Sequence, residues 1–166
     1  MMAENLLEKL FEHNNWANLR IIQACSALSD EQLDAAPISV TKGCIRETLT
    51  HLVSSQHNYL ALLTLPLEER TRIAPAFSEL REAVLRSGEA LLALARDESG
   101  FYAPTRLRTR DEYIVKPWVV MLQVINHASE HHEQISSMLT SLGIMPPEMN
   151  GWAYGEATTA LVPISA

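Results

Sequence analysis

Four long segments carry apolar side chains at helical spacing, and this feature constrains the fold more than any other. They span residues 4–28, 44–64, 76–96 and 118–142. In each segment the apolar residues recur every three or four positions, which places them on one face of a helix. Four amphipathic helices of similar length bury these faces most simply against one another. The sequence therefore predicts an all-α fold, a four-helix bundle that forms one domain over residues 1–166.

The connections between these segments differ in length and composition. Pro66 and Pro75 bracket the connection between the second and third helices. Before the last helix, residues 101–117 include an alternating stretch with three arginines, followed by strand formers, so we expect an irregular or hairpin-like connection there. Gly143 and the pair Pro146–Pro147 then end the last helix. Two of the connections are longer than hairpins between neighbouring helices need, which predicts at least one crossover.

Composition narrows the functions open to such a bundle. The formal net charge is -7, whereas a general nucleic-acid binder carries a basic surface, and anionic membranes attract basic proteins. No apolar run reaches the roughly 18 residues that a membrane span needs. The only cysteines, Cys25 and Cys44, are too few for a disulfide framework and are typical of a reducing compartment. We therefore expect a soluble, cytoplasmic protein that acts on a small molecule and binds neither nucleic acid nor membrane.

Two of the six histidines stand four residues apart on the last predicted helix. Four residues turn a helix by about 400°, so the rings of His127 and His131 share one face, one turn apart. Val120, Val124 and Met138 align with the pair and place it at or beside the buried face. Two imidazoles there need partners, because an unpaired buried polar group costs about 2 kcal/mol. A shared metal ion would satisfy both.

A third imidazole can come from the second predicted helix. His51 adjoins the apolar stripe through Leu52 and can point inward. His57 and His132 are expected at the surface, and His13 is interpreted as a solvated or hydrogen-bonded side chain rather than a ligand.

A site with three imidazoles suits Zn or Ni best, with Fe, Mn or Cu as alternatives. Three protein ligands leave one coordination position open, as in catalytic rather than structural zinc sites. The ring nitrogens that face away from the metal need hydrogen-bond acceptors. The residues within helical reach for this role are Asn126, Ser55 and Gln134.

The order of these features resembles the DinB/YfiT-like superfamily of bacterial proteins. The matching stretches are residues 51–53, residues 126–135 and residues 142–144 before the two prolines, and the resemblance covers nearly the whole chain. It implies a four-helix bundle with an up-down-down-up arrangement. It also implies one divalent metal ion, bound by a histidine of the second helix and an i,i+4 pair of a late helix. In this sequence those ligands are His51, His127 and His131.

The first functional hypothesis is a metal-dependent thiol S-transferase, because some members of the superfamily are thiol-dependent transferases or isomerases. A metal with an open position can bind a low-molecular-weight thiol and lower its pKa, which makes a thiolate nucleophile. Arg106, Arg108 and Arg110 are candidates to hold carboxylates of such a thiol cofactor. The simpler interpretation of these arginines, which the neighbouring Asp111 and Glu112 favour, is a solvated charged face.

Two other functions stay open. His127-x-x-Glu130-His131 matches the HxxEH pattern of a metal-dependent hydrolase, in which the glutamate activates a metal-bound water. Alternatively, the protein is a non-catalytic stress or interaction protein in which the metal ion only holds the helices of the bundle together. In either catalytic case we expect the metal in a cleft between the second and fourth helices, bordered by residues 101–117.

The expected oligomer is a homodimer. The tail, residues 148–166, is apolar at its end and carries two aromatic residues. Helix faces left over after bundle formation can bury against a second copy around a two-fold axis. Proteins of the resembled superfamily often dimerise, which supports the same expectation.

Overall fold

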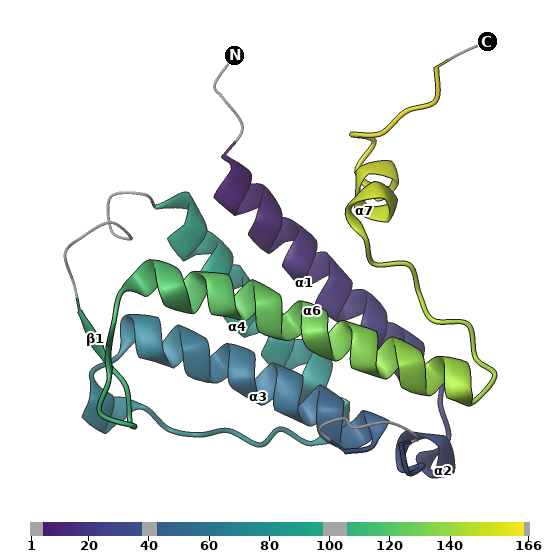
Figure 1. Ribbon diagram of the computed structural model, residues 1–166, viewed down its shortest axis with the longest axis horizontal. Coiled ribbons are helices and arrows are strands. Elements are labelled where there is room, and N and C mark those ends of the chain that lie inside the picture. The colour runs from purple at the N-terminus through teal and green to yellow at the C-terminus, as the bar shows by residue number, and fades with distance from the viewer. Residues whose placement is uncertain (1–4, 38–42, 98–105, 165–166) are drawn as a thin grey trace.

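Four long helices make up most of the protein, which we describe from a computed structural model covering residues 5–37, 43–97 and 106–164. The helices pack as a bundle (Figure 1). The predicted all-α four-helix fold is confirmed, and the helix ends lie close to the predicted ones. The bounds are α1 Leu6–Cys25, α3 Ile45–Thr64, α4 Leu80–Arg96 and α6 Pro117–Ser141.

The helices follow the up-down-down-up order that the resemblance implies. α1 and α6 run in one direction, and α3 and α4 run in the other (Figure 1). Both α1 and α3 pack against α4 and α6, so α1 and α3 occupy opposite corners of the bundle. Because α3 and α4 are parallel, the chain between them returns along the bundle as the expected crossover. It contains two short 3-10 helices, η1 Leu67–Glu69 and η2 Phe77–Glu79.

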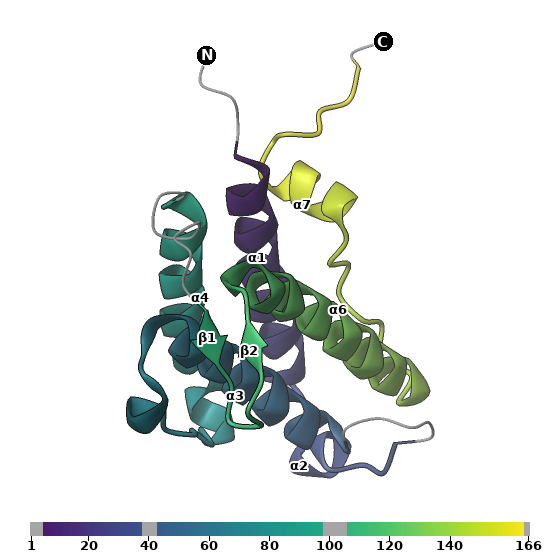
Figure 2. The same cartoon turned by 60° about the vertical axis from the view of Figure 1, so that its left-hand side comes forward.

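The short elements lie at the ends and along one side of the bundle. α2, Asp30–Leu33, joins α1 to α3. The predicted hairpin-like connection contains strands β1, Leu107–Arg108, and β2, Ile114–Val115, paired antiparallel beside the start of α6 (Figure 2). Its residues 101–105 lie outside the described part of the chain. The sequence did not predict α7, Gly151–Ala157, which packs beside α1 and begins at the N-cap Asn150.

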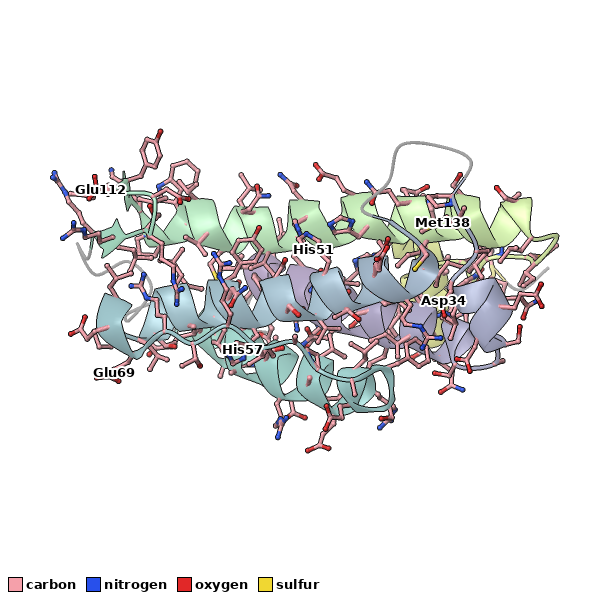
Figure 3. The ribbon with its side chains drawn as sticks, turned by 90° about the horizontal axis from the view of Figure 1, so that it is seen from below. Asp34, His51, His57, Glu69, Glu112 and Met138 are labelled. Carbon is pink, nitrogen blue, oxygen red and sulfur yellow. The ribbon has the colours of Figure 1, made fainter. Side chains whose placement is uncertain are left out.

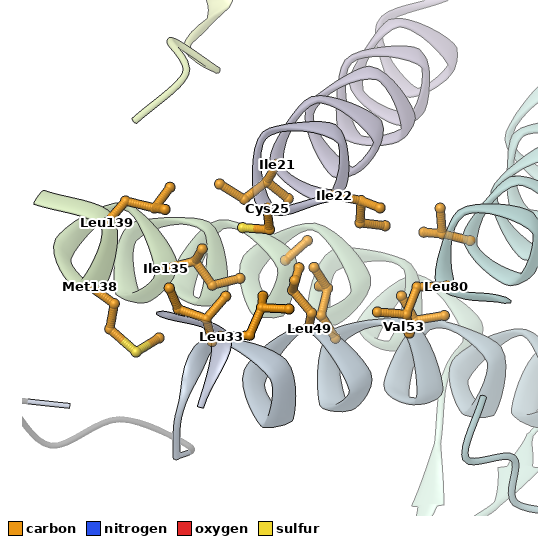
Figure 4. Packing of buried hydrophobic residues seen from close by; sticks show 14 of the residues in the cluster. Ile21, Ile22, Cys25, Leu33, Leu49, Val53, Leu80, Ile135, Met138 and Leu139 are labelled. Carbon is orange, nitrogen blue, oxygen red and sulfur yellow. The ribbon is translucent and has the colours of Figure 1, made fainter. Parts of the chain in front are cut away.

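Buried side chains form two apolar clusters separated by a polar layer. The larger cluster joins residues of all four long helices, among them Ile21, Leu49, Leu80 and Ile135 (Figure 4). The smaller cluster surrounds Phe11 nearer the other end of the bundle. Along α1, α3 and α4, the side chains of Asn14, Asn18, Gln56 and Ser87 fall between the residues that each helix gives to the two clusters, and His131 and His132 of α6 adjoin them beside the larger cluster. This polar layer consists of Asn14, Asn18, Gln56, Ser87, His131 and His132.

The helices of the described residues are all too short or too polar to cross a bilayer. α1 and α4 approach closely at Gly88, where an added Cβ would lie 2.5 Å from Oδ1 of Asn15. A residue without a side chain therefore suits this crossing point, because a larger residue at position 88 would have to displace the side chain of Asn15.

Candidate metal centre

The three predicted ligands meet between α3 and α6, where His51 points from α3 toward α6 (Figure 3). Nε2 of His127 lies 3.1 Å from Nε2 of His51 and 3.2 Å from Nε2 of His131. The potential ligand atoms of the three residues all lie within 4.8 Å of one another. Nitrogens bound tetrahedrally at about 2.0–2.1 Å from a zinc ion are about 3.3 Å apart. This group could therefore hold one divalent metal ion.

The helix that carries two of the ligands is long and unbroken. α6 begins with Pro117 in its first turn, a position where proline is tolerated, and continues for 25 residues. Its helical repeat brings the rings of His127 and His131 to a centroid distance of 4.4 Å. His131 is buried, whereas His127 and His51 are partly exposed. The group is consequently closed on the side of the core and reached by solvent on the other.

Gln134 determines which ring nitrogen of the buried His131 carries the proton. Nδ1 of His131 lies 2.7 Å from Oε1 of Gln134, one turn further along α6, and donates its proton to that oxygen. The tautomer that results leaves a lone pair on Nε2, which faces the other two rings. Gln134 is one of the three acceptors that the sequence predicts, and the structure places it on a candidate ligand.

Tyr59 is a neighbour of the histidines that the sequence analysis did not single out. Its ring meets the ring of His127 edge to face, with 5.6 Å between centroids. Burial raises the pKa of the Tyr59 hydroxyl, and the nearby charge of Glu130 acts in the same direction. Tyr59 stands eight residues after His51 on α3, and only the packing of α3 on α6 reveals the contact.

The prediction that His132 lies at the surface is wrong. Its side chain is buried, and Nε2 donates to Oδ1 of Asn18 on α1 over 2.7 Å. The pKa of His132 is lowered to about 4, chiefly by burial and to a smaller extent by the charges of His13 and His131. His132 faces α1 because neighbouring residues of a helix are turned by about 100° from each other, so it cannot share the α3 side with His131.

The hydrogen bonds continue from His132 through the polar layer. Asn18 Nδ2 donates to Oε1 of Gln56 over 2.8 Å. Gln56 in turn donates from Nε2 to Oγ of Ser87, also over 2.8 Å, and to the carbonyl of Val84 over 3.0 Å. This chain of bonds touches all four long helices and supports α6 directly behind the three-histidine group.

The other predicted histidine and carboxylate positions lie outside the group. His13 is hydrogen-bonded, as predicted, with Nε2 2.7 Å from the carbonyl of Met149. His57 is partly exposed. Glu130 is exposed and does not belong to the three-residue group. The geometry thus places no glutamate of the HxxEH pattern beside the histidine nitrogens.

The three arginines of the hairpin connection separate from one another. Arg106 and Arg108 are exposed, and Arg108 pairs with Glu112 at 3.8 Å, as expected of a solvated charged face. Only Arg110 lines a cavity that also includes Tyr59. The structure therefore does not bring the three side chains together as one binding element.

Neither cysteine joins the histidines. Cys25 lies in the larger apolar cluster, and burial raises the pKa of its thiol to about 12, which keeps it protonated and unreactive. Cys44 is partly exposed and stands at the start of α3, with Sγ 3.9 Å from a carboxylate oxygen of Asp34. Any thiol chemistry at the histidine group therefore needs a thiol from outside the chain.

The fold and the three histidines define a class of helical bundles with a candidate metal site between two helices. A model of the protein family described as the DinB family matches residues 1–162. The chain therefore belongs to the DinB family, in agreement with the resemblance found in the sequence. No significant match to the chain was found among curated proteins.

Proposed function

We propose that the protein binds one divalent metal ion through His51, His127 and His131 and acts as a metal-dependent thiol S-transferase on a small molecule. The observation that carries this proposal is the spacing of 3.1 and 3.2 Å between the three Nε2 atoms. Imidazole ligands without cysteine suit Zn or Ni, and three of them leave a position for an added ligand. The partial exposure of His51 and His127 gives that ligand a route of approach.

The bound metal would supply Lewis acidity, which lowers the pKa of a coordinating low-molecular-weight thiol and produces a thiolate nucleophile at neutral pH. The residues of the chain prepare the site for it. Gln134 keeps the Nε2 lone pair of His131 directed at the other rings, and the aromatic ring of Tyr59 shields one side of His127. Because Cys25 is buried and protonated, the attacking sulfur comes from the added thiol.

The first test measures the metal content of untagged protein purified without chelators. We expect about one equivalent of a divalent transition metal per chain. Removing a ligand should weaken metal binding at least about 100-fold, so the variants His51→Ala, His127→Ala and His131→Ala should be metal-free. The matched controls His13→Ala and His57→Ala should keep the metal. If all five variants lose metal equally, the effect is one of folding and the site assignment fails.

The second test separates catalysis from a structural role. Cobalt-substituted protein has a visible spectrum that reports its ligands, and we expect added 2-mercaptoethanol or azide to change it by entering the open position. If neither ligand changes the spectrum, the ion has no exchangeable position. The transferase proposal then fails, and the metal has only the structural role of holding α3 against α6.

A further inference from the structure

A cavity of about 200 Å³ lies between α3, the connection that follows it and the β1–β2 hairpin. Tyr59 contributes to its helical wall, and Arg70, Arg72, Arg110 and Asp111 line the part formed by the two connections. These arginines come from two segments almost 40 residues apart, so nothing in either segment alone indicates their meeting. The hairpin stands beside the end of α3 in Figure 2.

Two of the three guanidinium groups are fixed by backbone carbonyls. Arg70 donates from Nη1 to the carbonyl of Arg108 over 2.6 Å and from Nε to the carbonyl of Leu65 over 2.9 Å. Arg110 donates to the carbonyl of Arg70. Carbonyls orient these side chains without cancelling their charge, so both keep a full positive charge at the cavity.

The cavity carries an excess of positive charge. Within the described residues, Arg70, Arg72 and Arg110 make no ion pair with a carboxylate, and Asp111 is the one acidic residue in the lining. Four arginines elsewhere in the protein, Arg46, Arg86, Arg96 and Arg108, do pair with acidic side chains. Arg72 is exposed, and within the described residues its guanidinium makes neither a hydrogen bond nor an ion pair. Its planar fork of donors is thus available to an oxyanion.

Tyr59 connects this cavity to the candidate metal centre. Tyr59 lines the cavity, and its ring lies against the ring of His127, with 5.6 Å between centroids. Tyr59 therefore borders both the cavity and His127, which places the cavity beside the candidate metal centre.

We propose that this cavity is an anion-binding subsite, formed chiefly by Arg70, Arg72 and Arg110, for a carboxylate or phosphate group of the small molecule that reacts at the metal centre. The assignment to that molecule rests on the proposed function, whereas anion binding itself does not. It differs from the sequence-based candidates, because Arg110 alone of the three hairpin arginines takes part. The substrate or thiol is accordingly expected to be acidic.

The test uses inorganic phosphate and succinate as probes of metal-free protein, at constant ionic strength and followed by amide chemical shifts in NMR. We expect saturable shifts in residues 58–62, 70–72 and 109–111. Arg72→Ala should weaken the binding about tenfold, the effect of losing one charge-assisted hydrogen bond, and Arg72→Glu should abolish it. Comparison of the two probes tells whether the subsite prefers phosphate or carboxylate.

The matched control is Arg106→Ala, which removes the same charge from the same connection but outside the cavity lining. It should change the affinity less than about twofold, since distant exposed charges are screened by salt. If neither probe saturates, or if the two alanine variants lose affinity equally, the subsite does not exist. Since His127→Ala should lose the metal and still bind the anion, a failure of this inference is distinct from a failure of the metal site.

Discussion

At the scale of single residues, His131 and His132 have the same side chain and opposite roles. His131 turns toward α3, where its Nε2 lies among the other candidate ligands and its Nδ1 is bound by Gln134. His132 turns toward α1, is buried and donates to Asn18. Burial disfavours the charged imidazolium, which is why the pKa of His132 falls to about 4.

We predict that His132 makes the stability of the metal-free protein depend on pH. Its pKa is lower in the folded state than the value of about 6.5 in the unfolded chain, so the unfolded chain binds more protons between these two values. The neutral, buried His132 side chain therefore contributes to the free energy of unfolding above pH 6.5, and this stabilisation is lost as the pH falls toward 4. It amounts to about 3 kcal/mol between pH 7 and pH 4.

Urea denaturation of metal-free protein at several pH values measures this contribution. The variant His132→Gln cannot take up the proton, so its free energy of unfolding should fall less steeply below pH 6.5. His57→Gln is the control, because His57 is partly exposed, and it should keep the slope of the parent protein. Parallel curves for the parent protein and His132→Gln would refute the prediction.

At the scale of elements, the polar layer connects the four long helices through one side chain from each. Asn18 lies on α1, Gln56 on α3, Ser87 on α4 and His132 on α6, and their bonds form one chain. Sliding any helix by one residue would leave buried donors or acceptors without partners, which costs about 1–3 kcal/mol for each group. The layer therefore fixes how the helices are aligned, including α3 and α6, which carry the histidines.

Gln56 is the central member, and we predict that Gln56→Ala destabilises the protein by about 3 kcal/mol or more. The change leaves the amide of Asn18 and the hydroxyl of Ser87 without this partner and opens a space in the core. Urea denaturation should show the loss, whereas the exposed control Gln23→Ala should change the free energy of unfolding by less than about 0.5 kcal/mol. A loss below about 1 kcal/mol at Gln56 would mean that the layer contributes little.

At the scale of the whole molecule, several apolar side chains stay exposed. Trp152 in α7 is 72% exposed, in the tail that suggested self-association. A second group lies on the hairpin and the start of α6 and consists of Tyr113, Ile114, Trp118 and Leu122. Exposed apolar patches of this kind often mark sites of protein association.

We predict that the protein is a homodimer and that one of these surfaces is buried in it. Light scattering at micromolar concentration should give a mass of about twice 18.5 kDa. Leu122→Glu and Trp152→Glu each place a charge on one of the two surfaces, and the variant that dissociates identifies the interface. A parent protein that is monomeric at this concentration would end the prediction.

The sequence by itself determined the four helices and the histidine pair of α6, because both depend on local periodicity. Apolar spacing sets the face of each helix, and a four-residue offset sets the side that His127 and His131 share. The position of His51 beside them could be predicted because it adjoins the apolar stripe of its own helix. The short α7 was missed, since its seven residues bury too little surface to leave a periodic pattern.

Only the tertiary structure decided which side chains of different helices meet. His132 is buried because α1 supplies Asn18 on the side to which it turns, and Tyr59 reaches His127 because α3 packs on α6. Arg70 and Arg72 join Arg110 because the crossover and the hairpin lie against the same part of α3. These contacts depend on long-range packing, because which residues meet across two helices is determined by how the helices pack and not by spacing along the chain.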